Sequence, residues 1–223
     1  EILRCLVGSE MCIRDRSGAA TVNQIFFIVN QLALSIGNAL VAICSQYWGK
    51  QETGAIRKMT GVALALSVLI GAIVVTACTC IPEQLLRIFT TSPEIIAEGK
   101  AYLGLLKWTF LLFMISNLLI AMLRSVETVK ISFVISVVSL ITNGCINYTL
   151  IFGHFGFPEM GIQGAAVGTL TARMLELLII VVYIWKIDTK VRLFDINLFR
   201  TIFLPENRKI WGCLLYTSDA ADE

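Results

Sequence analysis

The chain has 223 residues, of which 57% are hydrophobic and 15% are charged. Soluble globular proteins carry about 25% charged residues, so this composition, with a mean hydropathy of +0.78, excludes an ordinary soluble domain. The formal net charge of +2 is uninformative by itself, because in membrane proteins the placement of charges matters more than their sum.

Apolar stretches long enough to cross a bilayer recur along the chain, and a helix needs about 20 such residues to do so. Because backbone groups in lipid must be satisfied internally, these stretches predict helices rather than open strands. We therefore expect an all-α, polytopic membrane helical bundle with the lipid bilayer as its surroundings. The predicted spans are about 22–48, 60–81, 101–123, 131–153 and 162–185.

The two ends differ from the rest and resemble translated sequencing-adapter DNA. The codons TGT CTC TTA TAC ACA TCT encode Cys213 to Ser218, and the reverse complement of that string, read one base out of phase, encodes Met11 to Asp15. The same adapter sequence, read in opposite directions at the two ends, is typical of a DNA fragment from a transposase-tagged sequencing library. We therefore treat 1–16 and 213–223 as non-native tails, and expect 17–212 to be an internal piece of a longer protein.

Cysteines give no sign of a metal centre once the tails are set aside. The remaining four lie in or at the ends of apolar stretches and have no His/Cys partners at metal-ligand spacing. We expect no metal site, and we expect these cysteines to be small buried hydrophobes. They are Cys44, Cys78, Cys80 and Cys145.

The first span is unusually polar for a membrane helix. Asn30, Gln31 and Asn38 belong to one stripe near heptad spacing, which indicates a helix that packs on partners or lines a cavity. The segment after the second span is mixed in charge, and its Ser92-Pro93-Glu94 sequence predicts a helix start. We expect a short interfacial helix there, leading into the third span.

Three amides lie deep in the third and fourth spans. Asn117 is in the third, and Asn143 and Asn147 are four residues apart in the fourth, so they share one helix face. An amide in hydrocarbon is costly unless it finds a partner. This face of the fourth span is therefore predicted to contact protein or a wet cavity.

The fifth span combines small residues with an ion pair. Gly164, Ala165 and Gly168 belong to a small-residue face that lets a neighbouring backbone approach closely. Arg173 and Glu176 are three residues apart at mid-span and can pair within the helix. A functional site and a neutralised structural pair both fit this pattern.

Basic residues concentrate after the first, third and fifth spans, whereas the opposite side has only Arg87 and Lys100. The positive-inside rule predicts that the loops after spans one, three and five are cytoplasmic. The basic segment 189–212 would then lie along the cytoplasmic membrane surface. The first span would enter from outside, which requires at least one earlier span.

Four motifs together resemble the first half of a bacterial multidrug and toxic compound extrusion (MATE) transporter. The resemblance covers about 21–188, in order and with the family's spacing. The segments that carry it are NQIFFIVN…SQYWGKQE, AMLRSVETVKISF, ITNGCINYTLIFG and GIQGAAVGTLTAR.

The resemblance implies a fold and a function. Residues 17–188 would be helices two to six of the N-terminal lobe, and 189–212 the cytoplasmic linker between lobes. The function implied is secondary active export of organic, often cationic, drugs or metabolites in exchange for Na⁺ or H⁺ across the inner (plasma) membrane. No enzyme activity and no cofactor beyond the coupling ion are implied. The partners would be a small organic substrate and the missing helix one and C-terminal lobe, with no nucleic acid, and this piece alone is expected to be inactive.

The resemblance also implies coupling residues. The family's helix-five pair falls on Asn143 and Asn147, its helix-six Thr falls on Thr169, and Asn117 is a looser match. Two features depart from the pattern. Helix one, which carries an acidic residue in the family, is absent from this sequence. Members with the full site also carry an Asp where Asn147 stands. An asparagine supplies a carbonyl oxygen but no charge or proton.

Two other membrane functions, a flippase and a scaffold, are alternatives to the transporter hypothesis. A lipid-linked saccharide flippase of the same wider superfamily would need clustered Arg or Lys to hold pyrophosphate, and only Lys107 and Arg173 are intramembrane here. A non-transporting membrane scaffold would not need costly amides at depth. An enzyme is not expected, since the sequence shows no nucleophile with a base, no paired carboxylates and no metal set.

Overall fold

The structure is a computed structural model. It describes residues 2–152 and 161–186, with side chains described for 17–151 and 163–186. The predicted linker 189–212 and tail 213–223 lie outside the described residues. All regular elements in the described part are helices: α1 (Ile2–Gly49), α2 (Thr53–Cys80), α3 (Pro82–Arg87), α4 (Pro93–Ser125), α5 (Val129–Phe152) and α6 (Gly161–Lys186).

The predicted membrane bundle is confirmed. Five helices are long and apolar enough to cross a membrane, and each contains the core of one predicted span. The largest difference is at the start, because α1 begins at Ile2 while its apolar part begins at Ser17. Residues 2–16 contain no proline, so nothing in them stops the helix.

The segment between the second and third spans also differs from the expectation in part. A short helix, α3, is present there, and it starts with proline at its first turn. The predicted start at Ser92-Pro93 is also correct. The helix that begins there, however, runs without a break through the third span to Ser125. Residues 94–125 contain no second proline, so the amphipathic and apolar parts form one helix, α4.

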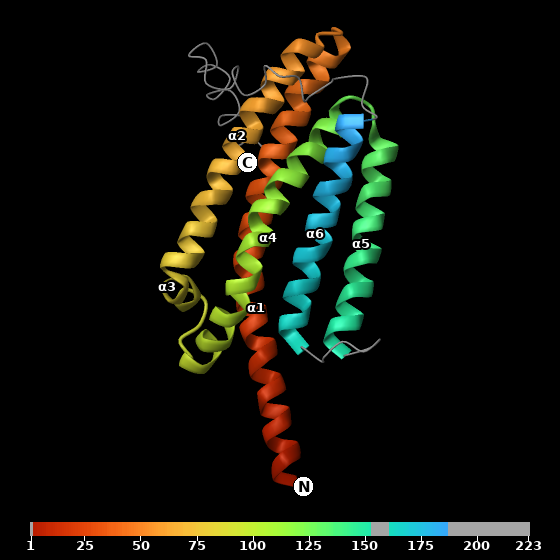
Figure 1. The fold of residues 1–223 in the computed structure, drawn as a ribbon. Coiled ribbons are helices and arrows are strands. Elements are labelled where there is room, and N and C mark those ends of the chain that lie inside the picture. The colour runs from red at the N-terminus through yellow and green to blue at the C-terminus, as the bar shows by residue number, and fades with distance from the viewer. Residues whose placement is uncertain (1, 153–160, 187–223) are drawn as a thin grey trace.

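Helix α4 is the centre of the bundle. In Figure 1 it crosses obliquely between the α1–α2 pair and the α5–α6 pair, and its most extensive packing is with α1, α2 and α6. Because it is covered on several sides, it contributes many of the fully buried side chains. These include Leu103, Phe110, Met114, Leu118, Met122 and Leu123.

The connections alternate between the two ends of the bundle. The α1–α2 turn, the α4–α5 turn and the end of α6 lie together at the upper end in Figure 1, and α3 lies towards the other. Both upper turns are tight, and each places a non-glycine residue at positive φ: Gln51 at 61° and Glu127 at 60°. The α1–α2 turn, the α4–α5 turn and the C-terminal end of α6 therefore share one end of the bundle.

The exposed faces of α5 and α6 are largely apolar. Helix α5 exposes Phe133 and Leu140, the latter at 73% of its surface, and α6 exposes Leu178. Such faces are stable in lipid, where no water has to be ordered around them, so the chain is a multi-pass membrane protein. The expectation that all four cysteines are buried is wrong for two of them. Cys44 and Cys78 are buried, but Cys80 and Cys145 are exposed, because they lie on helix faces that no described element covers.

Candidate functional site

The two predicted asparagines of α5 form a hydrogen-bonded pair. The side-chain amide of Asn147 donates to the side-chain carbonyl oxygen of Asn143 at 2.7 Å. The side-chain carbonyl oxygen of Asn147, Oδ1, is buried and accepts no hydrogen bond within the described part of the chain. A buried carbonyl oxygen without a donor costs about 1–3 kcal/mol. A cation or a water would satisfy it, and both bind to carbonyl oxygens.

Small residues of α6 make room for this pair. Gly168 faces Asn147 so closely that a Cβ at position 168 would overlap Asn147 Oδ1. One turn earlier, a Cβ at Gly164 would lie 2.9 Å from the backbone oxygen of Leu150. The small-residue face predicted for the fifth span is therefore the surface on which α5 packs.

Thr169 lies next to this contact but is not bonded to the pair. Its hydroxyl donates to the carbonyl oxygen of Ala165, one turn earlier in α6, at 2.8 Å. The hydroxyl oxygen can still accept or coordinate, because it has two lone pairs. Asn147 thus contacts α6 at Gly168, and Thr169 is the next residue of α6.

Asn117 lies at a different interface. Its side-chain amide donates to the backbone oxygen of Ala33 in α1 at 2.8 Å. Its Nδ2 atom also lies 3.2 Å from where a Cβ would be placed on Gly37. The close packing of α1 against α4 and this hydrogen bond indicate a helix-joining role. The structure does not bring Asn117 to the Asn143–Asn147 pair.

The amide stripe of α1 faces away from the described bundle. Asn30 is half-buried, whereas Gln31 and Asn38 are exposed. Side-chain amides at membrane depth are costly when they face lipid. This face of α1 therefore requires a polar surface or a wet cavity beside it.

A second polar group lies between α4, α5 and α6. Arg173 Nη1 and Glu176 Oε2 are 2.5 Å apart, and the hydroxyl of Ser139 on α5 donates to the same carboxylate oxygen at 3.2 Å. The guanidinium carbon of Arg173 lies 4.9 Å from the ring centroid of Phe113 on α4, within cation–π range. Glu176 is only 3% exposed. The predicted pair is formed, and it is tied to two further helices.

The two polar groups lie along one face of α5. Ser139, Asn143 and Asn147 are successive residues at spacing four, so they span roughly 12 Å of that face. All the groups at this interface that could hold a cation are oxygen atoms. Among the described residues, no cluster of three His, Cys, Asp or Glu side chains could hold a metal ion. The chemistry available at this interface is coordination of a small cation by oxygen atoms.

A family model named MatE matches residues 14–149, more than half of the chain. The chain belongs to the MatE family. A relative of this MatE chain is "Probable multidrug resistance protein NorM" of Rhizobium meliloti (strain 1021), which is 30% identical over 161 residues. The match covers 72% of this chain and 34% of the relative. This chain thus spans about a third of the length of that relative.

Solved structures show the same fold for the MatE chain. One, titled an outward-facing conformation of a multidrug resistance MATE family transporter of the MOP superfamily, matches with a TM-score of 0.80 at 18% identity. It covers 91% of this chain and 43% of that one. Another, titled the inward-facing conformation of such a transporter, also has a TM-score of 0.80, at 17% identity, and covers 92% and 44%.

Sequence reasoning missed two members of the polar groups in this MatE chain. Ser139 lies four residues, or about one α-helical turn, before Asn143, so this spacing is a signal from which it could have been predicted. Phe113 gave no comparable signal, because it lies in an apolar run of α4 and its contact with Arg173 joins residues far apart in the sequence. Only the packing of α4 against α6 reveals that contact.

Proposed function

We propose that this MatE chain is part of the N-terminal lobe of a secondary active transporter that exports organic, often cationic, drugs or metabolites in exchange for Na⁺ or H⁺. The observation that carries the proposal is the buried, unpartnered carbonyl oxygen of Asn147 at the α5–α6 interface. It provides a place where a small cation can gain coordination inside a membrane protein. The Rhizobium meliloti relative is named a probable multidrug resistance protein, which supports the export of organic compounds.

Coupling-ion binding would use neutral oxygens of this chain. The candidate ligands are Asn147 Oδ1, the second lone pair of Asn143 Oδ1, and Thr169 Oγ1. These ligands carry no charge, so they favour a monovalent ion over a divalent one. A carboxylate from a segment outside this chain would complete the site.

The transport mechanism we propose is rocking of two lobes about a central cavity. Ion binding drives such a change only if the ion has different affinities for the two states. The equal TM-scores to structures titled outward-facing and inward-facing support a five-helix unit that keeps its fold while the whole transporter changes state. The exposed amides Gln31 and Asn38 of α1 suit a helix that faces such a cavity.

The proposed location is the bacterial inner (plasma) membrane, with the loops after spans one, three and five in the cytoplasm. The support is the concentration of lysine and arginine at that end of the bundle. The partners in this proposal are the lipid bilayer, an organic substrate, a preceding helix one and a C-terminal lobe.

A saccharide flippase and a scaffold are less well supported. A flippase needs basic groups that are free to bind pyrophosphate. Arg173 is engaged by Glu176 and Phe113, and Lys107 donates to Thr79 Oγ1 at 3.1 Å and lies over the ring of Trp108. A scaffold gives no reason for an unsatisfied carbonyl oxygen at the α5–α6 interface.

The test begins with the source DNA. Sequencing across both ends of this reading frame is expected to replace the tails by further membrane helices, and native DNA that encodes the tails would contradict the adapter interpretation. The complete gene is then expressed in an efflux-deficient bacterial host, and ethidium export is measured with and without Na⁺ and H⁺ gradients. We expect gradient-dependent export that falls about tenfold in Asn147→Ala, since one good ligand is worth about 1.4 kcal/mol or more.

The matched control is Cys145→Ala, on the exposed face of the same helix. We expect it to export as the unchanged protein does. If Asn147→Ala exports as well as this control does, the proposed ion site at the α5–α6 interface is contradicted. No export of any organic cation would overturn the proposed activity.

A further inference from the structure

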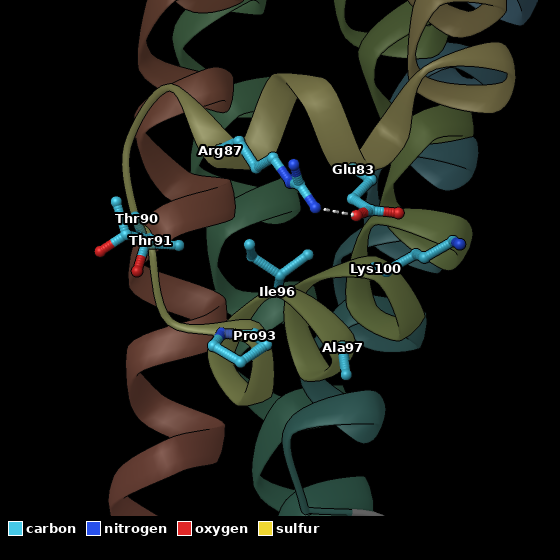
Figure 2. A pocket seen from close by; sticks show the side chains of 8 residues that line it. All are labelled: Glu83, Arg87, Thr90, Thr91, Pro93, Ile96, Ala97 and Lys100. Atoms are coloured by element: carbon cyan, nitrogen blue, oxygen red, sulfur yellow. Dashed lines mark hydrogen bonds and ion pairs between the residues drawn. The ribbon is translucent and has the colours of Figure 1, made fainter.

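A pocket of about 670 Å³ lies between α3 and the first two turns of α4, away from the α5–α6 interface. Figure 2 shows Arg87 and Glu83 of α3 reaching towards each other above Ile96, with Lys100 extending outward on the Glu83 side. The hydroxyl-bearing Thr90 and Thr91 line the opposite side. A smaller adjoining pocket of about 320 Å³ shares Glu83, Arg87 and Lys100.

This pocket lies at the end of two apolar spans. The span of α2 ends at Cys80 and that of α4 begins at Pro93, so α3 lies where hydrocarbon gives way to headgroups. Beside it, Ile88 is 72% exposed and Phe89 is also exposed. An amphipathic segment with exposed apolar side chains next to basic ones is typical of an element lying in the membrane interface.

The two basic side chains of α3 and the start of α4 both line the pocket. Arg87 and Lys100 are the only basic residues in the stretch 81–106, they come from different helices, and both line the pocket. Arg87 is paired with Glu83 at 2.7 Å, whereas Lys100 has no ion-pair partner among the described residues. Neither Glu94 nor Glu98 lines the pocket, so its lining carries one net positive charge.

We propose that this pocket binds the headgroup phosphate of an anionic bilayer phospholipid. Lys100 and Arg87 contact the phosphate, and Ile96 and Ile88 contact the adjoining apolar part of the lipid. One net charge in an exposed pocket attracts a free anion only weakly, because water screens it. A phospholipid adds apolar burial to the same phosphate contact and is already concentrated at this level of the membrane.

The test uses the full chain, purified in detergent, and native mass spectrometry to titrate phosphatidylglycerol and phosphatidylcholine. We expect phosphatidylglycerol to bind more tightly. The double variant Arg87→Gln/Lys100→Gln is expected to weaken phosphatidylglycerol binding roughly tenfold or more. The charge-matched control Lys58→Gln/Lys130→Gln removes two exposed lysines from the opposite end of the bundle and is expected to leave this high-affinity binding unchanged.

Three results would overturn the proposal: equal binding by the pocket variant and the unchanged chain, equal weakening in the pocket and control variants, or displacement of phosphatidylglycerol by millimolar inorganic phosphate. The last would assign the pocket to a free anion. All four substituted side chains are exposed, and circular dichroism melting of each variant checks that the fold is kept. The measurement needs no transport, so its outcome is independent of the proposed export activity.

Discussion

The side-chain amide of Asn147 donates to the side-chain oxygen of Asn143 one turn earlier in α5, and the other oxygen of the pair, Asn147 Oδ1, is left buried without a donor. The hydrogen bond fixes the orientation of the Asn147 amide, because its nitrogen is held on Asn143. The free oxygen therefore points at α6, where Gly168 leaves room for it. A fixed, unsatisfied oxygen in a close helix–helix contact is suited to binding a cation.

Sodium is therefore expected to stabilise the purified chain. Replacing choline by Na⁺ at constant ionic strength should raise the melting temperature, since a ligand at 100 times its Kd stabilises the native state by about 2.7 kcal/mol. Differential scanning fluorimetry measures the shift. The shift should vanish in Asn147→Ala and persist in Cys145→Ala. An equal shift in both variants would mean that Na⁺ binds elsewhere.

Gly168→Ala should destabilise the bundle. The added Cβ would overlap Asn147 Oδ1 and lie 3.3 Å from the Asn147 backbone nitrogen, so α5 and α6 must separate or the amide must rotate, at a cost of about 1–3 kcal/mol. Gly144→Ala is the matched control, because nothing lies within 4 Å of a Cβ there. The control should be neutral or stabilising by up to about 1 kcal/mol, because alanine favours a helix. Reversible unfolding in mixed micelles compares the two free energies, and equal effects would contradict the close approach.

Arg173→Met should destabilise the bundle more than the double variant Arg173→Met/Glu176→Leu. Removing the arginine leaves the carboxylate of Glu176 buried without its counter-ion, which costs about 3–5 kcal/mol. Replacing both charges by apolar groups avoids that penalty. A double-mutant cycle on the free energy of unfolding measures the coupling. Additive effects would show that Arg173 and Glu176 do not depend on each other.

Asn117→Ala should weaken the contact between α1 and α4. The variant loses the hydrogen bond to the Ala33 backbone oxygen, and interhelical hydrogen bonds in membranes contribute about 1 kcal/mol. Asn38→Ala is the control, because Asn38 is exposed; its effect should stay within about 0.5 kcal/mol. If the control destabilises the bundle more than Asn117→Ala in the same unfolding assay, Asn117 is not the amide that joins α1 to α4.

Membrane sidedness is testable by thiol labelling in intact cells. In a background where Cys80, Cys145 and the tail cysteines Cys5, Cys12 and Cys213 are replaced by serine, Ser92→Cys is expected to react with an impermeant maleimide added outside. Thr128→Cys, at the opposite end of the bundle, is expected to react only after the cells are permeabilised. The reverse pattern would place the loops after spans one, three and five outside the cytoplasm.

The membrane bundle and the residue pairs within single helices follow from the amino-acid sequence. Five apolar stretches of spanning length dictate five helices, because only helices satisfy the backbone within lipid. Spacing within one helix also predicts the Asn143–Asn147 and Arg173–Glu176 contacts, since residues three or four apart share a helix face. These features depend only on residues close together in the sequence and on the geometry of a single helix.

Which helix faces meet depends on how the helices pack in three dimensions. The Asn117–Ala33 hydrogen bond joins residues that are 84 positions apart in the sequence. The Ser139–Glu176 hydrogen bond joins residues that are 37 positions apart. Arg87 and Lys100 converge on one pocket because α3 folds back against α4. Each of these contacts depends on the rotation and crossing of whole helices, which the packing of many side chains sets together. The spacing of residues along a single helix does not contain that information.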